Sequence, residues 1–142
     1  MQPREDADYR IVLAEEALVL ARRDFGLQSW PTCLDFSQQT VENAAKAVLA
    51  VFGPHPPTHG PGDLLRQRVR RSLFPQGAVA DVLRLASLSD AYGPDVHMRV
   101  RYGDEMNRIP PSLLFSEGSG RDALAAAEEA LRLAKELLAA LP

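Results

Sequence analysis

The amino-acid sequence predicts an all-α fold, an antiparallel up-and-down bundle of four to five helices in a single domain over residues 1–142. Apolar residues recur at steps of three and four along four long segments, the spacing of one helix face. Only residues 97–102 show the apolar–polar alternation of a half-buried strand. Amphipathic helices with short connections bury their apolar faces most simply in an antiparallel bundle.

The first two helices are expected to be long. The first is predicted from about Ala7 to Phe25, where a glycine ends it. Its predicted core stripe consists of Tyr9, Val12, Leu13, Ala17, Leu20 and Ala21. The second is predicted after Trp30-Pro31, with Thr32 as N-cap, and continues to Phe52 before a Gly-Pro pair. Its predicted stripe consists of Leu34, Val41, Ala45, Val48 and Phe52.

The remaining helices follow a loop rich in proline and glycine. Asp63 is expected to cap a third helix that runs to about Phe74, and a fourth helix follows Pro75 and ends near Asp90. Residues 91–120 form the least regular part of the chain. The last helix is expected to be capped by Ser119 or Asp122. Its predicted stripe consists of Leu124, Ala127, Leu131, Ala134, Leu138 and Leu141.

The composition is that of an ordinary soluble globular protein. The chain has 142 residues, 46% of them hydrophobic and 25% charged, with a formal charge of −3. No apolar run is long enough to span a bilayer, and the first residues lack the apolar segment of a signal peptide. One cysteine, Cys33, excludes an internal disulfide and a multi-cysteine zinc site. We therefore expect a cytoplasmic protein without a cofactor or metal.

Positive charge is concentrated in the middle of the sequence. Residues 66–108 hold eight arginines and five acidic residues. A nucleic-acid binder needs many cations spread over one surface, whereas a small anionic ligand or an acidic partner needs only a local patch. The alternative is that these arginines cover the solvated faces of surface helices.

The second helix carries polar side chains in two ridges. Gln38, Glu42 and Lys46 follow one another at steps of four, and Gln39 and Asn43 lie beside them. Such a face is either solvent-exposed, with a weak Glu42–Lys46 ion pair, or it lines a site or an interface. Spacing favours the exposed face.

Histidines supply the second set of candidate residues. His55 and His59 lie four residues apart in the Pro-rich loop, where this spacing has no helical geometry and does not indicate a metal site. His97 and Arg101 share a face whether the segment is a strand or a helix. This pair suits a phosphate, because arginine offers bidentate donors and histidine can move a proton. The alternative is a surface cluster near acidic residues.

Four motifs in order resemble the HEPN domain (higher eukaryotes and prokaryotes nucleotide-binding). The segment from Phe36 to Leu49 resembles the signature helix of this family, a Gln-Gln-x-x-Glu-x-x-x-Lys-Ala pattern. Thr58-His59 followed by Asp63-Leu64-Leu65 resembles the loop before its third helix. Arg101-Tyr102-Gly103-Asp104 resembles its Arg-Tyr-Pro-Asp-like segment, and an alanine-rich C-terminal helix follows.

The resemblance implies a helical bundle that commonly forms a homodimer and is associated with nucleotides or RNA. It also implies a separately encoded minimal nucleotidyltransferase as partner in a toxin–antitoxin-like pair. The residues at the family's motif positions are Gln39, Glu42, Lys46, His59, Arg101 and Tyr102. Two departures alter the motifs: Gly103 replaces a proline, and Gly60-Pro61-Gly62 replaces a more direct His-Asp link.

The motif of the family's ribonucleases, an arginine followed after four to six residues by a histidine, has no match in this sequence. We therefore expect a non-catalytic module in which Lys46, His59, Arg99 and Arg101 contact a phosphate. Gln39, Glu42 and Tyr102 complete the expected ligand-binding set. One alternative is a metal-independent RNase toxin that uses His97 as base and Arg101 to stabilise charge. Another is a ligand-free scaffold whose Arg66–Arg71 run contacts an acidic partner.

Overall fold

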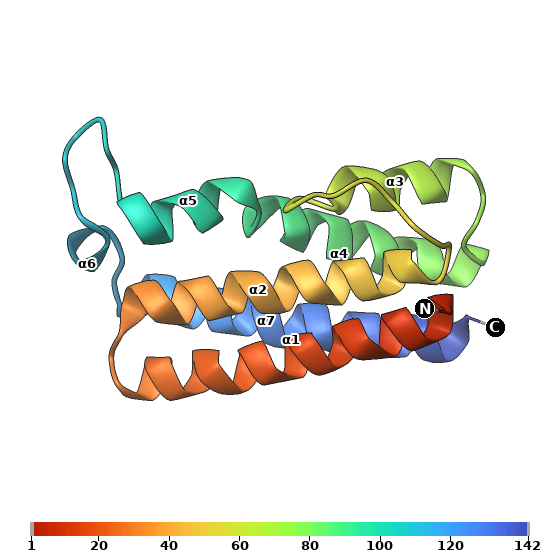
Figure 1. Ribbon diagram of the computed structural model, residues 1–142, viewed down its shortest axis with the longest axis horizontal. Coiled ribbons are helices and arrows are strands. Elements are labelled where there is room, and N and C mark those ends of the chain that lie inside the picture. Colours follow the sequence, from red (N-terminus) through yellow and green to blue (C-terminus); the bar gives the residue numbers. More distant parts are fainter. Residues whose placement is uncertain (1, 142) are drawn as a thin grey trace.

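Three long helices form the centre of the fold. They are α1 (Pro3–Gly26), α2 (Trp30–Ala50) and α7 (Glu117–Ala140). α1 and α2 lie side by side in antiparallel directions, and α7 packs against both (Figure 1). This computed structural model describes residues 2–141, and within that range it confirms the predicted all-α bundle.

A second layer of helices covers α2 and α7. It consists of α3 (Gly62–Arg70), a short 3-10 turn (Gln76–Ala78), α4 (Val79–Ala91), α5 (Pro94–Tyr102) and α6 (Pro111–Leu114). α4 packs on both α2 and α7, whereas α5 continues in line with α4 and lies over the first half of α2 (Figure 1). The loop after α2 turns back over that helix before α3 begins.

The segment 97–102 belongs to helix α5 and not to a strand. Pro94 starts this helix, and the His97 amide donates to the Gly93 carbonyl at 3.1 Å. Extended backbone pairs in the described part of the chain only between Asp104 and Ile109. The stretch 91–120, expected to be irregular, therefore contains two short helices and this single bridge.

The predicted N-caps of α2 and α7 are wrong, and the residues that cap these two helices in the structure show why. Ser29 and not Thr32 occupies the N-cap position of α2, and the Thr32 hydroxyl donates back to the Ser29 carbonyl at 3.2 Å. At α7 the Ser116 side chain accepts from the Ser119 amide, and the Ser119 hydroxyl oxygen accepts from the Ser116 amide. This capping box starts α7 earlier than its two predicted caps allow.

The core stripe of α7 is confirmed. Ala127, Leu131, Ala134 and Leu138 are buried, and the two end positions of the stripe are partly buried. On α1 the predicted stripe is partly wrong, because the side chains of Tyr9 and Val12 are 52% and 48% exposed. The buried residues of α1 are Ala7, Ala14, Ala17, Leu18, Ala21 and Asp24. This mostly small-residue face lets α1 pack closely against α2 and α7.

The single cysteine lies inside the bundle. Cys33 is fully buried on α2, and its Sγ is 3.8 Å from the Gly120 carbonyl of α7. Beside it, Trp30 packs edge-on against Phe25 with ring centroids 5.4 Å apart. Within the described residues, none of the helices combines the length and apolar character needed to cross a membrane.

Candidate functional site

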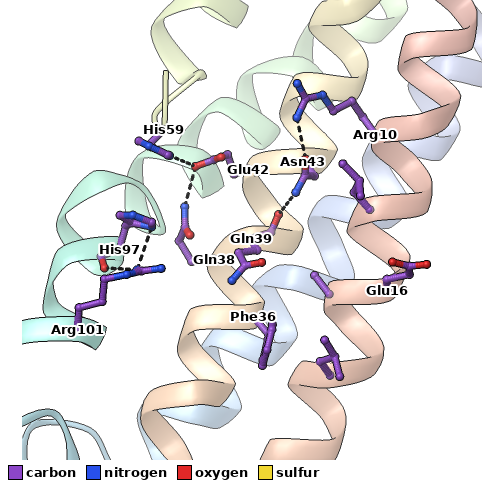
Figure 2. A pocket seen from close by; sticks show the side chains of 13 residues that line it. Arg10, Glu16, Phe36, Gln38, Gln39, Glu42, Asn43, His59, His97 and Arg101 are labelled. Atoms are coloured by element: carbon purple, nitrogen blue, oxygen red, sulfur yellow. Dashed lines mark hydrogen bonds and ion pairs between the residues drawn. The ribbon is translucent and has the colours of Figure 1, made fainter. Parts of the chain in front are cut away.

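A groove of about 500 Å³ runs between α1, α2 and α5, with the loop before α3 at one end. Figure 2 shows that its polar side chains project from all three helices and from this loop. The lining residues are Arg10, Leu13, Glu16, Ala17, Leu20, Phe36, Gln38, Gln39, Glu42, Asn43, His59, His97 and Arg101. The polar ridges of α2 and the histidine–arginine pair of α5 therefore face one cavity.

Glu42 is the centre of the hydrogen bonds in this groove. Its Oε1 accepts from Gln38 Nε2 at 3.1 Å and from His59 Nδ1 at 3.1 Å, and its Oε2 accepts from Lys46 Nζ at 3.2 Å. Only 14% of the Glu42 side chain and 12% of the Lys46 side chain are exposed. The Glu42 and Lys46 side chains are consequently mostly buried, and the expectation of a solvent-exposed face is wrong.

The surroundings of Glu42 keep its carboxylate ionised. Burial raises the pKa of Glu42, but the Lys46 charge and the hydrogen bonds from Gln38, Lys46 and His59 outweigh it. The pKa consequently lies below the ordinary value of 4.5. Since an ionised carboxylate only accepts hydrogen bonds, His59 must donate its Nδ1 proton, which leaves Nε2 available to a ligand.

Close backbone packing brings His59 to this groove. A Cβ atom added at Gly60 would lie 3.1 Å from Cδ of Pro94, so glycine lets the loop approach the start of α5. The rings of His59 and His97 stack there, with centroids 4.7 Å apart and planes inclined by 16°. The Gly-Pro-Gly departure from the family motif therefore accompanies a tight contact between the loop and α5.

His97 and Arg101 form a pair one turn apart on α5. Arg101 Nη1 donates to the His97 carbonyl at 2.8 Å, lies 3.2 Å from His97 Nδ1 and is 3.6 Å from Asp35 Oδ1. Partial burial lowers the pKa of His97 below its ordinary 6.5, and Arg101 and His59 lower it further against the opposing pull of the nearby carboxylates. The remaining N–H groups of the guanidinium can still bind an anion.

The wall opposite α5 belongs to α1, and sequence reasoning missed most of it. Arg10 Nη1 donates to Asn43 Oδ1 at 3.3 Å, and Asn43 Nδ2 donates to the Gln39 carbonyl at 3.0 Å. Leu13 and Leu20, both assigned to the core by their spacing, line the groove instead. The helical periodicity of α1 places Arg10 near these residues and is the one local signal that could have found it.

Two predicted ligand-binding residues lie outside the groove. Arg99 pairs with Asp95 at 4.0 Å on the outer side of α5, and the Tyr102 side chain is 56% exposed at the end of that helix. Neither lines the cavity. Gly103 follows with φ of +67°, which a proline cannot adopt, so the replacement of proline at this position fits the local backbone.

A second cavity of about 360 Å³ adjoins the first between the N-terminal half of α1 and the Pro-rich loop. Arg10 and His59 line both cavities. The other residues around the second cavity are Asp6, Lys46, Gly53, Pro54, His55, Pro57 and Thr58. Lys46, a predicted phosphate ligand, thus faces this second cavity.

The basic side chains of the two cavities suit an anion, although Glu16, Glu42 and Asp6 also line them. Arginine, lysine and histidine donors surround them, and side-chain amides stand beside an aromatic ring in the larger one. No cluster of three or more potential metal ligands occurs among residues 2–141.

Comparison with known proteins agrees with the resemblance found in the sequence. The crystal structure of TT1696 from Thermus thermophilus has a TM-score of 0.71 and 23% sequence identity, over 96% of this chain and 98% of that chain. This likeness supports the fold. No curated protein matches the chain. The sequence profile of the HEPN domain matches residues 7–140. Since that match spans nearly the whole sequence, the chain belongs to the HEPN domain family.

Proposed function

We propose that the protein is a non-catalytic HEPN module that binds a nucleotide through its phosphate in the groove between α1, α2 and α5. The observation that supports this proposal is the convergence of the α2 ridge, His59 and Arg101 around one cavity. These groups come from three separate elements, and a chance surface cluster would not combine half-buried polar side chains with an open cavity of this size.

Each part of the groove has a distinct task in this proposal. The free N–H groups of Arg101 contact phosphate oxygens, and Nε2 of His59 donates to them when the imidazole carries a proton on both nitrogens. Glu42 holds His59 in position and does not touch the ligand, because its oxygens are already occupied. Gln39 offers its amide to the base, and Phe36 offers its ring.

Calorimetric titration with AMP, GMP and inorganic phosphate tests the proposal. Arg101→Gln is expected to weaken nucleotide binding about ten- to a hundredfold, since one charge-assisted contact contributes roughly 1.5–3 kcal/mol. Arg99→Gln is the matched control, because this arginine belongs to the same helix but does not line the groove. Absence of heat at millimolar nucleotide, or equal loss in both variants, would remove the proposal.

The module is further proposed to act as a homodimer. Tyr9, Val12 and Val19 expose apolar side chains on α1, with 52%, 48% and 62% of each accessible. Val12, Glu16 and Val19 share one helix face, and Glu16 lines the groove, so this apolar strip borders the site. Light scattering is expected to give twice the monomer mass for the natural protein and the monomer mass for Val12→Glu. A monomer in both cases contradicts the dimer.

A minimal nucleotidyltransferase is the proposed protein partner, in a toxin–antitoxin-like pair. Membership of the HEPN family supports this partner. Co-expression with the nucleotidyltransferase from a neighbouring gene is expected to give a complex that survives gel filtration. Separate elution of the two proteins, with dimerisation but without nucleotide binding, would favour a ligand-free scaffold instead.

The groove also favours one alternative activity, metal-independent RNA cleavage. His97 lies beside Arg101, and Glu42 fixes the orientation of the stacked His59 ring. In this alternative His97 accepts the 2′-hydroxyl proton and Arg101 stabilises the phosphate charge. Incubation of RNA with EDTA is expected to show cleavage that His97→Ala abolishes. Absent cleavage, or equal cleavage by both proteins, excludes the activity.

A further inference from the structure

We infer that the nucleotide carries a chain of two or more phosphates, and that the chain beyond the first phosphate lies in the second cavity beside Lys46 and His55. This inference rests on the nucleotide-binding function proposed above. It adds the class of ligand, a nucleoside di- or triphosphate, and it places the further phosphates in the second cavity, where the motif residues Lys46 and His59 lie with His55, which none of the HEPN motifs includes. Three observations carry it.

The first observation is that the two cavities adjoin and share two lining residues. Arg10 and His59 line both cavities. Each of the two side chains is hydrogen-bonded to a residue that lines the first cavity. Arg10 is bound to Asn43 at 3.3 Å, and His59 is bound to Glu42 at 3.1 Å. A phosphate placed against His59 in the groove is consequently next to the entrance of the second cavity.

The second observation is the difference in charge between the cavities. Each cavity is lined by two histidines and two permanently charged cations, but the larger groove also has two carboxylates, together with the apolar walls that a nucleoside needs. The smaller cavity has Arg10, Lys46 and two histidines against a single carboxylate, Asp6. Lys46 uses one of its three N–H donors on Glu42, which leaves two for phosphate oxygens. The cationic excess thus lies where additional phosphates would extend.

The third observation is that the wall of the second cavity is restricted in conformation. Pro54 and Pro57 line it, and the fixed φ of proline limits the shapes available to the loop. His55 Nδ1 contacts the Pro56 carbonyl at 2.9 Å, and the Thr58 hydroxyl accepts from the Gly60 amide at 2.9 Å. A loop ordered before binding loses little conformational entropy when an anion enters.

The test compares adenosine, AMP, ADP and ATP by calorimetry in buffer with EDTA, so that no metal accompanies the phosphates. ATP should bind about tenfold more tightly than AMP, because its additional phosphates make one or two more charge-assisted contacts. His55→Ala is expected to lower ATP affinity several-fold and to leave AMP affinity unchanged. Arg101→Gln is expected to weaken both nucleotides equally, since it acts on the first phosphate.

A second variant tests the same cavity through a gain in affinity, which misfolding cannot produce. Asp6→Asn removes the single carboxylate of the second cavity and is expected to tighten ATP binding about threefold without changing AMP binding. Asp8→Asn is the matched control on α1, because Asp8 pairs with Arg4 at 3.8 Å and lines neither cavity.

The possible outcomes separate this inference from the function on which it rests. Equal affinities for AMP and ATP, with AMP binding retained, overturn the inference alone. Absence of binding by every nucleotide overturns the proposed function together with it. A short oligoadenylate that binds more tightly than ATP, while ATP binds no better than AMP, would assign the second cavity to an RNA strand and would also overturn the inference.

Discussion

Helices α2 and α7 lie side by side in the bundle, yet they bury different kinds of side chain. Apart from Gly120, every buried residue of α7 is alanine or leucine. The buried residues of α2 include Ser37, Gln38 and Thr40 together with its apolar stripe. On α7 the charged side chains other than Glu129 are exposed, whereas Glu42 and Lys46 of α2 are each more than four-fifths covered.

This difference shows that the two helices meet different requirements. A helix that only packs places its polar groups in water, because burying them costs free energy unless each finds a partner. Helix α2 accepts this cost along one face, where Gln38, Lys46 and His59 satisfy Glu42. Buried polar side chains on a helix that is otherwise apolar therefore locate the groove.

The largest effect is expected from the packing helix. Leu137→Ala removes a side chain that is 2% exposed and is expected to lower the free energy of unfolding by about 2–4 kcal/mol, because a cavity replaces packed methyl groups. Urea denaturation measures this loss, and nucleotide affinity below the transition should not change. A loss below about 1 kcal/mol would show that α7 repacks and would weaken the contrast.

A smaller loss of stability, together with a loss of binding, is expected from α2. Glu42→Gln leaves the half-buried Lys46 ammonium without a countercharge and is expected to cost about 1–3 kcal/mol. It also frees His59, so nucleotide affinity should fall. Glu128→Gln on the surface of α7 is the control and should change neither quantity. Retained nucleotide affinity in Glu42→Gln would show that the carboxylate does not position the site.

The contribution of Glu42 should also depend on pH. Its pKa is lower in the folded protein than in the unfolded chain, so the unfolded chain binds more protons between these two values. The stabilisation is therefore fully present above the ordinary pKa of 4.5 and is lost as the pH falls through the folded pKa. Denaturation curves of the natural protein and Glu42→Gln should converge in acid. A difference that is independent of pH contradicts this assignment.

A local effect is expected at His97. Its imidazole should titrate below 6.5 when followed by NMR, and Arg101→Gln should move the pKa upward, because a neighbouring positive charge is removed. Arg99→Gln, on the outer side of the same helix, is the comparison variant and should produce the smaller shift. An unchanged pKa in Arg101→Gln would mean that burial and His59 lower it without Arg101.

The smallest effect is expected on the exposed side of α7. Arg132 lies 3.2 Å from Glu136, and both side chains are more than half exposed. Arg132→Ala should change the free energy of unfolding by about 0.5 kcal/mol or less, since water screens such pairs. A loss as large as that of Glu42→Gln would remove the distinction between the two helices.

The sequence predicted what depends on local spacing. The stripe of α7 and the pairing of His97 with Arg101 follow from helical periodicity, and the structure contains both. The α2 ridge was recognised as well, but its direction was not, because a ridge of polar residues has the same spacing whether it faces water or another helix. Its direction is set by α5, which follows it by more than forty residues.

The rest of the site depends on contacts between distant segments. Arg10 reaches Asn43 across 33 residues, and no motif near either one indicates the contact. His59 meets His97 where Gly60 lies close to Pro94, a contact between the loop and a helix more than thirty residues later. The apolar wall was misassigned for a related reason: Leu13 and Leu20 have the same helical spacing whether they contact the core or line a cavity.

Because Cys33 is buried, the reaction of its thiol with a reagent in solution reports how often the helical bundle opens. The thiol is fully covered, and burial raises its pKa, so a thiol reagent in solution cannot reach it while α2 and α7 remain together. Since the sequence has no other cysteine, every labelled molecule records one opening of the bundle around Cys33. The labelling rate therefore measures how often the bundle opens, without a probe having to be engineered into it.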